Sequence, residues 1–165
     1  MTISLERLFS GEEHEILLNE SFDFSKEPVQ DAFPFAAPVK LTGKIEARAQ
    51  VVSLEAEAEV RYHAFCDRCA REAERRYRVP VCHVLVEELQ HEDDEDDYIL
   101  VEDRQLDLER LTLEDIYLFL PSKFLCTDDC KGICPQCGTN LNEASCNCKK
   151  EVDPRFAALL DMLED

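Results

Sequence analysis

The stretch VKLTGKIEARAQVVSLEAEAEVRY, residues 39–62, alternates apolar or small residues with polar ones along almost its whole length. Apolar or small residues occupy odd positions from Val39 to Val51 and even positions from Val52 to Tyr62. Strict alternation is typical of a β-strand and outweighs the helix propensity of the Ala and Glu residues. A single strand of this length would be longer than a small domain, so the change of phase at Val51–Val52 predicts a turn between two strands.

A further strand is predicted just downstream, in RRYRVPVCHVLVEEL at residues 75–89, antiparallel to the one before it. This pairing places FCDRCARE, residues 65–72, at the tip of a hairpin. Shorter strands are predicted at residues 3–9, 15–24 and 98–102. Three prolines make residues 26–40 an irregular connection.

Two helices are predicted from capping signals. In DLERLTLEDIYLFLP, residues 107–121, Asp107 is the N-cap and Pro121 ends the helix. In DPRFAALLDML, residues 153–163, Asp153 is the cap and the apolar residues share one face. The predicted fold class is α+β, with an antiparallel β-sheet or partly closed barrel and a few short helices in residues 1–121. Residues 122–165 are predicted to form a cysteine-rich, zinc-knuckle-like appendage with the second helix.

Length and composition limit the class of protein. The 165 residues suit one domain with a small appendage, and 45% hydrophobic residues are enough for a core. No apolar run is long enough to span a bilayer, and the N-terminus lacks the apolar segment of a secretory signal. We therefore expect a cytoplasmic protein without a membrane partner, in a compartment where thiols stay reduced.

The charge is strongly acidic and uneven. A net charge of −19 argues against a bulk nucleic-acid coat protein. Fourteen acidic residues and two arginines lie between Glu87 and Asp115, including the run HEDDEDD at residues 91–97. A local strip is basic instead, and its six arginines are candidates for RNA phosphate contacts: Arg61, Arg68, Arg71, Arg75, Arg76 and Arg78.

The nine cysteines point to a metal site. Zinc favours four soft ligands in a tetrahedron, and C-x-x-C places two thiolates on one tight turn. We expect four ligands from the C-terminal cluster, and spacing does not choose among its six members: Cys126, Cys130, Cys134, Cys137, Cys146 and Cys148. The hairpin pair, Cys66 and Cys69, is a further candidate. Cys82, within a strand, is interpreted as a small buried hydrophobe.

The predicted zinc is structural, because four cysteines close its coordination and no histidine lies in the cluster. A thiol redox switch is the alternative for the same residues. The sequence contains no phosphate-binding loop, nucleophile elbow or H-E-x-x-H motif, so we expect a protein that is not an enzyme.

The order of these motifs resembles a known family. FCDRCARE after an alternating strand is followed by the 107–121 helix, CKGICPQCGTNLN, a C-x-C and DPRFAALL. This order is similar to that of the YceD-like family of large ribosomal RNA subunit accumulation proteins, in the form carried by Gram-positive bacteria. The resemblance covers about residues 40 to 165.

The resemblance implies a role in accumulation or processing of 23S ribosomal RNA during assembly of the large ribosomal subunit. The expected partner is 23S rRNA or a pre-ribosomal particle, bound through the arginine strip. The alternative is an acidic chaperone that holds a basic large-subunit ribosomal protein through the segment from Glu87 to Asp115.

Overall fold

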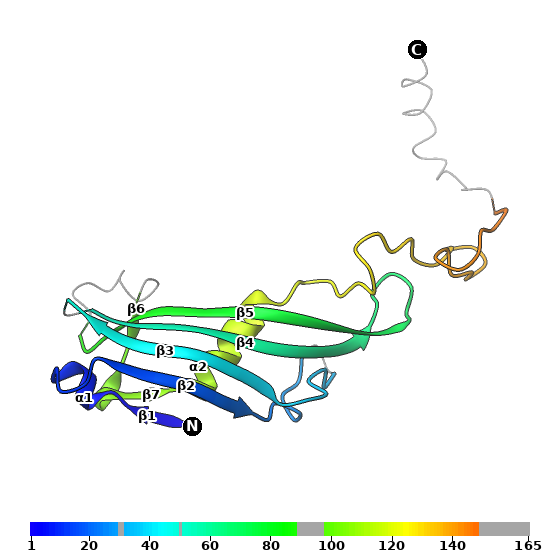
Figure 1. Ribbon diagram of the computed structural model, residues 1–165. Helices are drawn as coiled ribbons and strands as arrows, with labels where there is room; N and C mark the ends of the chain where they lie inside the picture. Colours follow the sequence, from blue (N-terminus) through cyan, green and yellow to red (C-terminus); the bar gives the residue numbers. More distant parts are fainter. Residues whose placement is uncertain (30–31, 50, 89–97, 149–165) are drawn as a thin grey trace, which may run out of the picture.

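The structure, a computed structural model, describes residues 1–29, 32–49, 51–88 and 98–148. Its main feature is a five-stranded sheet in the order β2-β3-β4-β5-β6 (Figure 1). The strands are β2 (Glu15–Phe22), β3 (Val39–Arg48), β4 (Val51–Phe65), β5 (Glu72–Val86) and β6 (Tyr98–Leu100). Neighbouring strands are antiparallel except β5 and β6, which run parallel.

The sheet is open, and the expectation of a partly closed barrel is wrong. Among the described strands, β2 and β6 are the two edges and do not pair with each other. The inner face of the sheet is covered by helix α2 (Leu108–Phe119) and by a ribbon of β1 (Thr2–Ser4) and β7 (Gln105–Asp107). Because other elements bury this face, the sheet does not have to curl onto itself to do so.

The alternating stretch that opens the sequence forms the β3–β4 hairpin. The chain turns between Arg48 and Val51, slightly earlier than predicted, and Ala49 takes a φ of 51° there. The change of phase is confirmed, because odd residues of β3 and even residues of β4 face the core. Fully buried examples are Val39, Leu41, Ile45, Leu54 and Ala58.

The N-terminal strand is shorter than predicted. Residues 3–9 were expected to be one strand, but the strand ends at Ser4 and helix α1 (Glu6–Phe9) follows. Leu5 and Leu8 are both buried, at 0% and 2% exposure. Their three-residue spacing suits a helical turn and not an alternating strand, which would place them on opposite faces.

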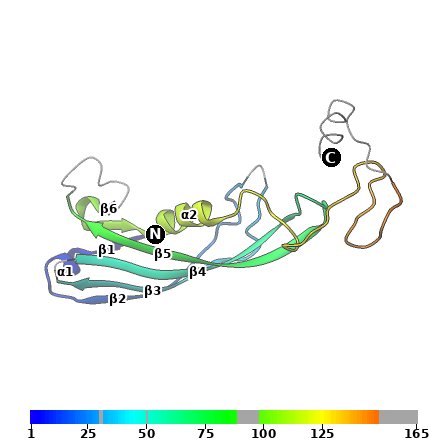
Figure 2. The same cartoon turned by 90° about the horizontal axis from the view of Figure 1, so that it is seen from above.

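Helix α2 confirms its sequence prediction. The Asp107 side chain accepts a hydrogen bond from the Arg110 N–H at 3.3 Å, as an N-cap does. Figure 2 shows the helix on one side of the sheet. It packs against β5, where His83 Nε2 lies 2.8 Å from Asp115 Oδ2. No element that the structure describes covers the opposite face of the sheet, which is called the open face below.

Two sequence predictions lie outside the described residues: the acidic run at 91–97 and the helix at 153–163. Among the helices that the structure describes, none has the length and apolar character needed to cross a membrane.

Gly43 of β3 lies opposite Ala56 of β4 and leaves no room for a side chain. A Cβ on Gly43 would come within 3.0 Å of the Glu55 carbonyl oxygen and of Ala56. We expect Gly43→Ala to lower the free energy of unfolding by about 1–3 kcal/mol, because the strands must shift apart. Urea unfolding followed by circular dichroism measures this, with the exposed neighbour Thr42→Ala as control. Equal midpoints for the two variants would contradict the prediction.

Candidate metal centre

The cysteines gather in two groups of four. The tip group consists of Cys66, Cys69, Cys126 and Cys130. The loop group consists of Cys134, Cys137, Cys146 and Cys148. Within each group the sulfur atoms all lie within 4.8 Å of one another, and all eight residues are free thiols. Both groups are therefore positioned to hold a metal ion.

The tip group begins at the tip of the β4–β5 hairpin. The Cys66 N–H donates to the Arg71 carbonyl at 2.9 Å, and the Ala70 N–H donates to the Cys66 carbonyl at 2.8 Å. Ala70 has a φ of 53°, which few residues other than glycine adopt. This tight turn brings Cys66 and Cys69 to the same side of the hairpin end.

The loop group begins with the same turn. The Cys134 N–H donates to the Thr139 carbonyl at 2.8 Å, and the Gly138 N–H donates to the Cys134 carbonyl at 2.9 Å. Gly138, with a φ of 74°, stands where Ala70 stands in the hairpin turn. The two C-x-x-C turns thus share one hydrogen-bond pattern, and that pattern fits a metal-binding knuckle.

The other half of the tip group comes from the segment after α2, which runs to the hairpin end (Figure 1). The Asp67 N–H donates to the Phe124 carbonyl at 2.9 Å, and the Phe124 N–H donates to the Asp67 carboxylate at 2.6 Å. Beyond Cys130, the Ile133 N–H donates to the Arg68 carbonyl at 3.1 Å. The segment is held on both sides of the cysteines, so Cys126 and Cys130 face the hairpin turn.

The spacing of the sulfur atoms in the tip group fits zinc. Cys66 Sγ lies 3.7 Å from Cys130 Sγ, and Cys69 Sγ lies 3.6 Å from Cys126 Sγ. A tetrahedral ion with metal–sulfur bonds of about 2.3 Å separates its ligand sulfurs by about 3.8 Å. The four thiols therefore stand close to the positions that a bound ion requires.

The electrostatics of the tip group favour a cation. Burial raises the pKa of Cys66, but backbone N–H groups of Cys126, Arg68 and Cys69 outweigh burial and lower it to about 6. The pKa of Cys69 is lowered by the Arg71 N–H but raised by burial and by the neighbouring thiols, to about 12. Thiolates this close cannot all form unless a cation balances their charge.

The loop group shows the same separation of pKa values. The Thr139 hydroxyl and N–H lower the pKa of Cys137 to about 6. The Cys137 side chain raises the pKa of Cys148 to about 12. A divalent metal ion would stabilise all four thiolates of this group as well.

Three of the six candidate RNA-contacting arginines lie at the joint between the hairpin and the C-terminal segment. Arg68 Nη1 donates to the Cys130 carbonyl at 3.0 Å, and Arg75 Nη1 donates to Asp128 at 2.9 Å. The pKa of Arg71 is raised chiefly by the Cys126 side chain beside it. These side chains hold the joint together.

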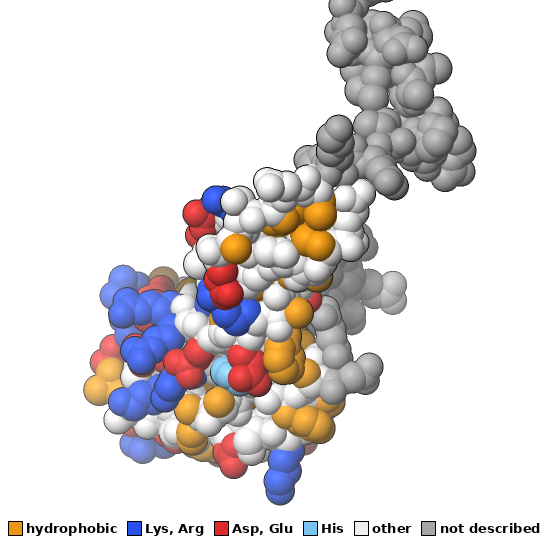
Figure 3. All heavy atoms as spheres, turned by 90° about the vertical axis from the view of Figure 1, so that its right-hand side faces the viewer, with side chains coloured by type: hydrophobic (Ala, Val, Ile, Leu, Met, Phe, Trp, Pro, Cys, Tyr) orange, Lys and Arg blue, Asp and Glu red, His pale blue; other side chains and the backbone are white. Residues whose placement is uncertain are grey.

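The remaining three arginines share the open face of the sheet. Arg61 pairs with Arg76 in the strand register and binds Glu74 through two nitrogens, with distances from 2.9 to 3.3 Å. With Arg78 they line a hollow of about 320 Å³. Figure 3 shows Lys and Arg side chains gathered on one side of the hairpin end, with acidic side chains among them.

Cys82 belongs to neither group. It was interpreted as a buried hydrophobe, but it is exposed on the open face. Val79 and Val81 face the core, so the alternation of β5 points Cys82 outward.

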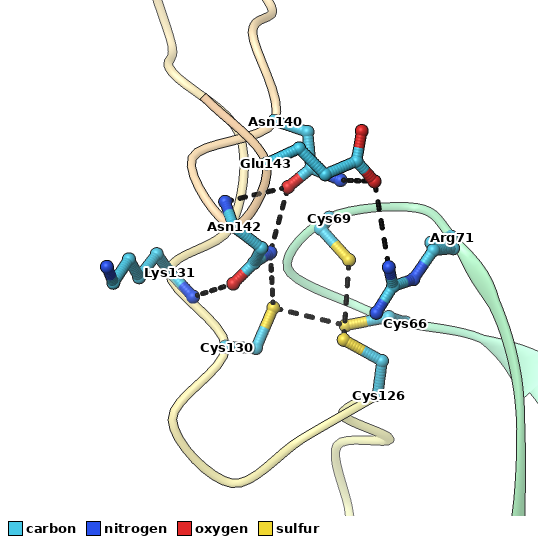
Figure 4. A network of polar contacts seen from close by, with 9 residues as sticks. All are labelled: Cys66, Cys69, Arg71, Cys126, Cys130, Lys131, Asn140, Asn142 and Glu143. Atoms are coloured by element: carbon cyan, nitrogen blue, oxygen red, sulfur yellow. Dashed lines mark hydrogen bonds and ion pairs between the residues drawn. The ribbon is translucent and has the colours of Figure 1, made fainter. Parts of the chain in front are cut away.

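Two residues that the sequence interpretation missed lie beside the tip group (Figure 4). Asn142 Nδ2 donates to Cys130 Sγ at 3.3 Å, and Glu143 lies 3.6 Å from Arg71. Both belong to the loop that joins the knuckles of the loop group, yet both contact the tip group. No spacing rule marks such residues in a sequence, because their partners are set by the fold.

The chain was compared with known proteins. A family model described as "Large ribosomal RNA subunit accumulation protein YceD" matches residues 52–163. Uncharacterized protein YlbN of Bacillus subtilis is 28% identical over 132 residues, which are 78% of this chain and 76% of YlbN.

Two mycobacterial relatives match a shorter part of the chain. An uncharacterized protein of Mycobacterium tuberculosis is 39% identical over 70 residues, 42% of this chain. One of Mycobacterium leprae is 36% identical over 63 residues, 38% of this chain. The matches span 34% and 29% of the lengths of these two relatives. No solved structure gives a significant match.

Proposed function

The chain belongs to the family of the large ribosomal RNA subunit accumulation protein YceD, and on this basis we propose that it acts in 23S rRNA accumulation during assembly of the large ribosomal subunit. The family match to residues 52–163 is the observation that carries the proposal. The matched region contains both cysteine groups and all six arginines of the basic strip.

The proposed mode of action is binding and not catalysis. Each cysteine group supplies four thiols, which complete a tetrahedral coordination and leave no position for a substrate. Four soft sulfur ligands favour zinc over the hard cations. The two zinc ions would then be structural, and their task would be to fix the C-terminal segment at the end of the β4–β5 hairpin.

The open-face arginines are the proposed contact with RNA. Among the described residues, Arg76 makes no ion pair, and Arg78 reaches Glu57 only at 3.8 Å. Both side chains are therefore available for phosphate groups. They lie two residues apart on one strand, so both point to the same side and can follow one RNA backbone.

Depletion of the protein from cells tests the proposed function. We expect the ratio of 23S rRNA to small-subunit rRNA to fall, and free small subunits to accumulate on sucrose gradients. An unchanged ratio in depleted cells would contradict the proposal. An unrelated assembly factor depleted in parallel serves as the positive control.

Crosslinking in the same cells separates the two candidate partners. Sequencing of RNA crosslinked to the tagged full chain is expected to recover 23S rRNA segments. Recovery of a basic ribosomal protein in a stable complex that survives nuclease treatment, without RNA crosslinks, would favour the acidic chaperone instead.

A further inference from the structure

We propose that the two cysteine groups form one coupled two-metal centre, in which metal at the loop group strengthens metal binding at the tip group. The coupling residue is Asn142. This inference rests on the metal binding proposed above but not on the role in rRNA accumulation.

Asn142 is oriented by hydrogen bonds at both ends of its side chain (Figure 4). Its Oδ1 accepts the Lys131 N–H at 2.7 Å, so the amide nitrogen must face the Cys130 sulfur, 3.3 Å away. Asn140 Oδ1 accepts from the Asn142 N–H at 3.0 Å and from Nδ2 at 2.8 Å. A hydrogen bond to a ligand sulfur stabilises the thiolate and supports its metal.

A second contact joins the groups on the other side of the tip. Glu143 Oε1 lies 3.6 Å from Arg71 Nη1 and accepts from Asn140 Nδ2 at 3.2 Å. The Arg71 guanidinium lies beside Cys126 (Figure 4). The loop thus contacts Cys130 directly through Asn142, and it reaches Cys126 indirectly, through Glu143 and Arg71.

Apart from the loop group and the contacts of Asn142 and Glu143, the loop is held by backbone hydrogen bonds, such as that from the Leu141 N–H to the Gly132 carbonyl at 2.9 Å. No side chain of residues 138–145 is buried. Segments too poor in apolar contacts to fold alone take their folding free energy from the metal. Closing the loop between Cys137 and Cys146 around an ion therefore also places Asn142 against Cys130.

The link between the groups is short and tied down. Only three residues separate Cys130 from Cys134, and the Ile133 N–H in this link donates to the Arg68 carbonyl. A Cβ on Gly132 would already lie 3.0 Å from the Arg68 carbonyl oxygen. Because the link cannot swing freely, ordering of one group restricts the conformations that the other group can adopt. Because coupling between binding sites is reciprocal, the tip group must also strengthen the loop group.

Cobalt(II) titration of the full-length reduced apoprotein tests the coupling, with a chelator as competitor. Single-site constants come from Cys146→Ser/Cys148→Ser and from Cys66→Ser/Cys69→Ser. We expect the two-metal constant of the intact chain to exceed the product of the single-site constants by about 10- to 100-fold, the range typical of lost ligand-supporting hydrogen bonds.

Asn142→Asp is the diagnostic variant, since it keeps the shape of the side chain and removes the donor to sulfur. We expect it to bring the ratio of the two-metal constant to the product of the single-site constants close to one. We also expect the sulfur-to-cobalt charge-transfer band to shift to longer wavelength, because the Cys130 thiolate becomes easier to oxidise. The exposed Asn19→Asp on β2 is the matched control and should change neither. A ratio of one in the intact chain, or a ratio unchanged by Asn142→Asp, overturns the coupling. Failure to bind cobalt at all overturns the proposed metal binding instead.

Discussion

Replacing Cys69 with serine is expected to lower bound zinc from about two ions per chain to about one and to release the C-terminal segment from the hairpin. The tip group would keep three thiols, and the metal-binding free energy of a four-cysteine site is about 10–16 kcal/mol. The two hydrogen bonds between Asp67 and Phe124 would remain, one to the Phe124 carbonyl and one to the Asp67 carboxylate, but they stabilise the joint by only about 1–3 kcal/mol each.

The sheet itself should survive this change. Its core is a separate cluster that contains no cysteine, and it includes residues from β1 to α2. We therefore expect the far-ultraviolet circular dichroism spectrum of Cys69→Ser to keep its β-sheet character. Limited proteolysis, by contrast, should cut the segment after Pro121 much faster than in the unaltered protein.

Metal analysis after dialysis, together with proteolysis followed by mass spectrometry, measures both effects. Cys82→Ser is the matched control, because Cys82 is an exposed cysteine outside both groups. It should retain two zinc ions and the original cleavage rate. Two zinc ions in Cys69→Ser, with an unchanged cleavage rate, would show that Cys69 is not a metal ligand and would contradict the prediction.

The sequence predicts the sheet well where side chains alternate. The alternation of residues 39–62 and the cap at Asp107 depend on neighbouring residues along the chain, so β3, β4 and α2 can be predicted from local pattern. The open edges of the sheet cannot, because they depend on which elements cover its inner face. Helix α1 is hidden because four residues are too few to display a helical period.

The grouping of the cysteines is not a local property either. Spacing identifies the knuckles but not their partners, and Cys66 meets Cys130 across 64 residues. That meeting depends on where α2 ends and on the length of the β4–β5 hairpin. One signal was present: CDRCAR and CPQCGT form the same turn, but Ala70 stands where a glycine would have made the likeness visible.

The arginine strip was also divided by the fold. Even-numbered residues of β5 face solvent, whereas Arg75 points to the inner side, where it binds Asp128. Alternation predicts that Arg76 and Arg78 share a face. It does not predict that Arg68 and Arg71 contact the C-terminal segment at the joint, because that segment lies far away in the sequence.

The double variant Arg76→Glu/Arg78→Glu is expected to weaken binding of 23S rRNA fragments more than tenfold at physiological salt. Each arginine would neutralise one phosphate, and each reversed charge would repel it instead. Each phosphate contact contributes roughly 0.9 to the slope of log affinity against log salt concentration. Loss of two contacts should therefore make this slope shallower by about two. Both side chains are exposed and lie outside the cysteine groups, so zinc content should not change.

Fluorescence anisotropy with transcribed 23S rRNA domains, measured over a range of salt concentrations, gives both the affinity and the slope. The matched control is Arg7→Glu/Arg48→Glu, which makes the same change in net charge in α1 and at the end of β3. Helix α1 and the β3–β4 turn lie at the end of the sheet remote from the hairpin tip (Figure 1). If binding depended only on total charge, both variants would lose affinity equally. A loss confined to Arg76→Glu/Arg78→Glu would locate the RNA contact on the open face. Unchanged affinity and slope in that variant would exclude this face, because an RNA bound there cannot avoid two reversed charges on one strand.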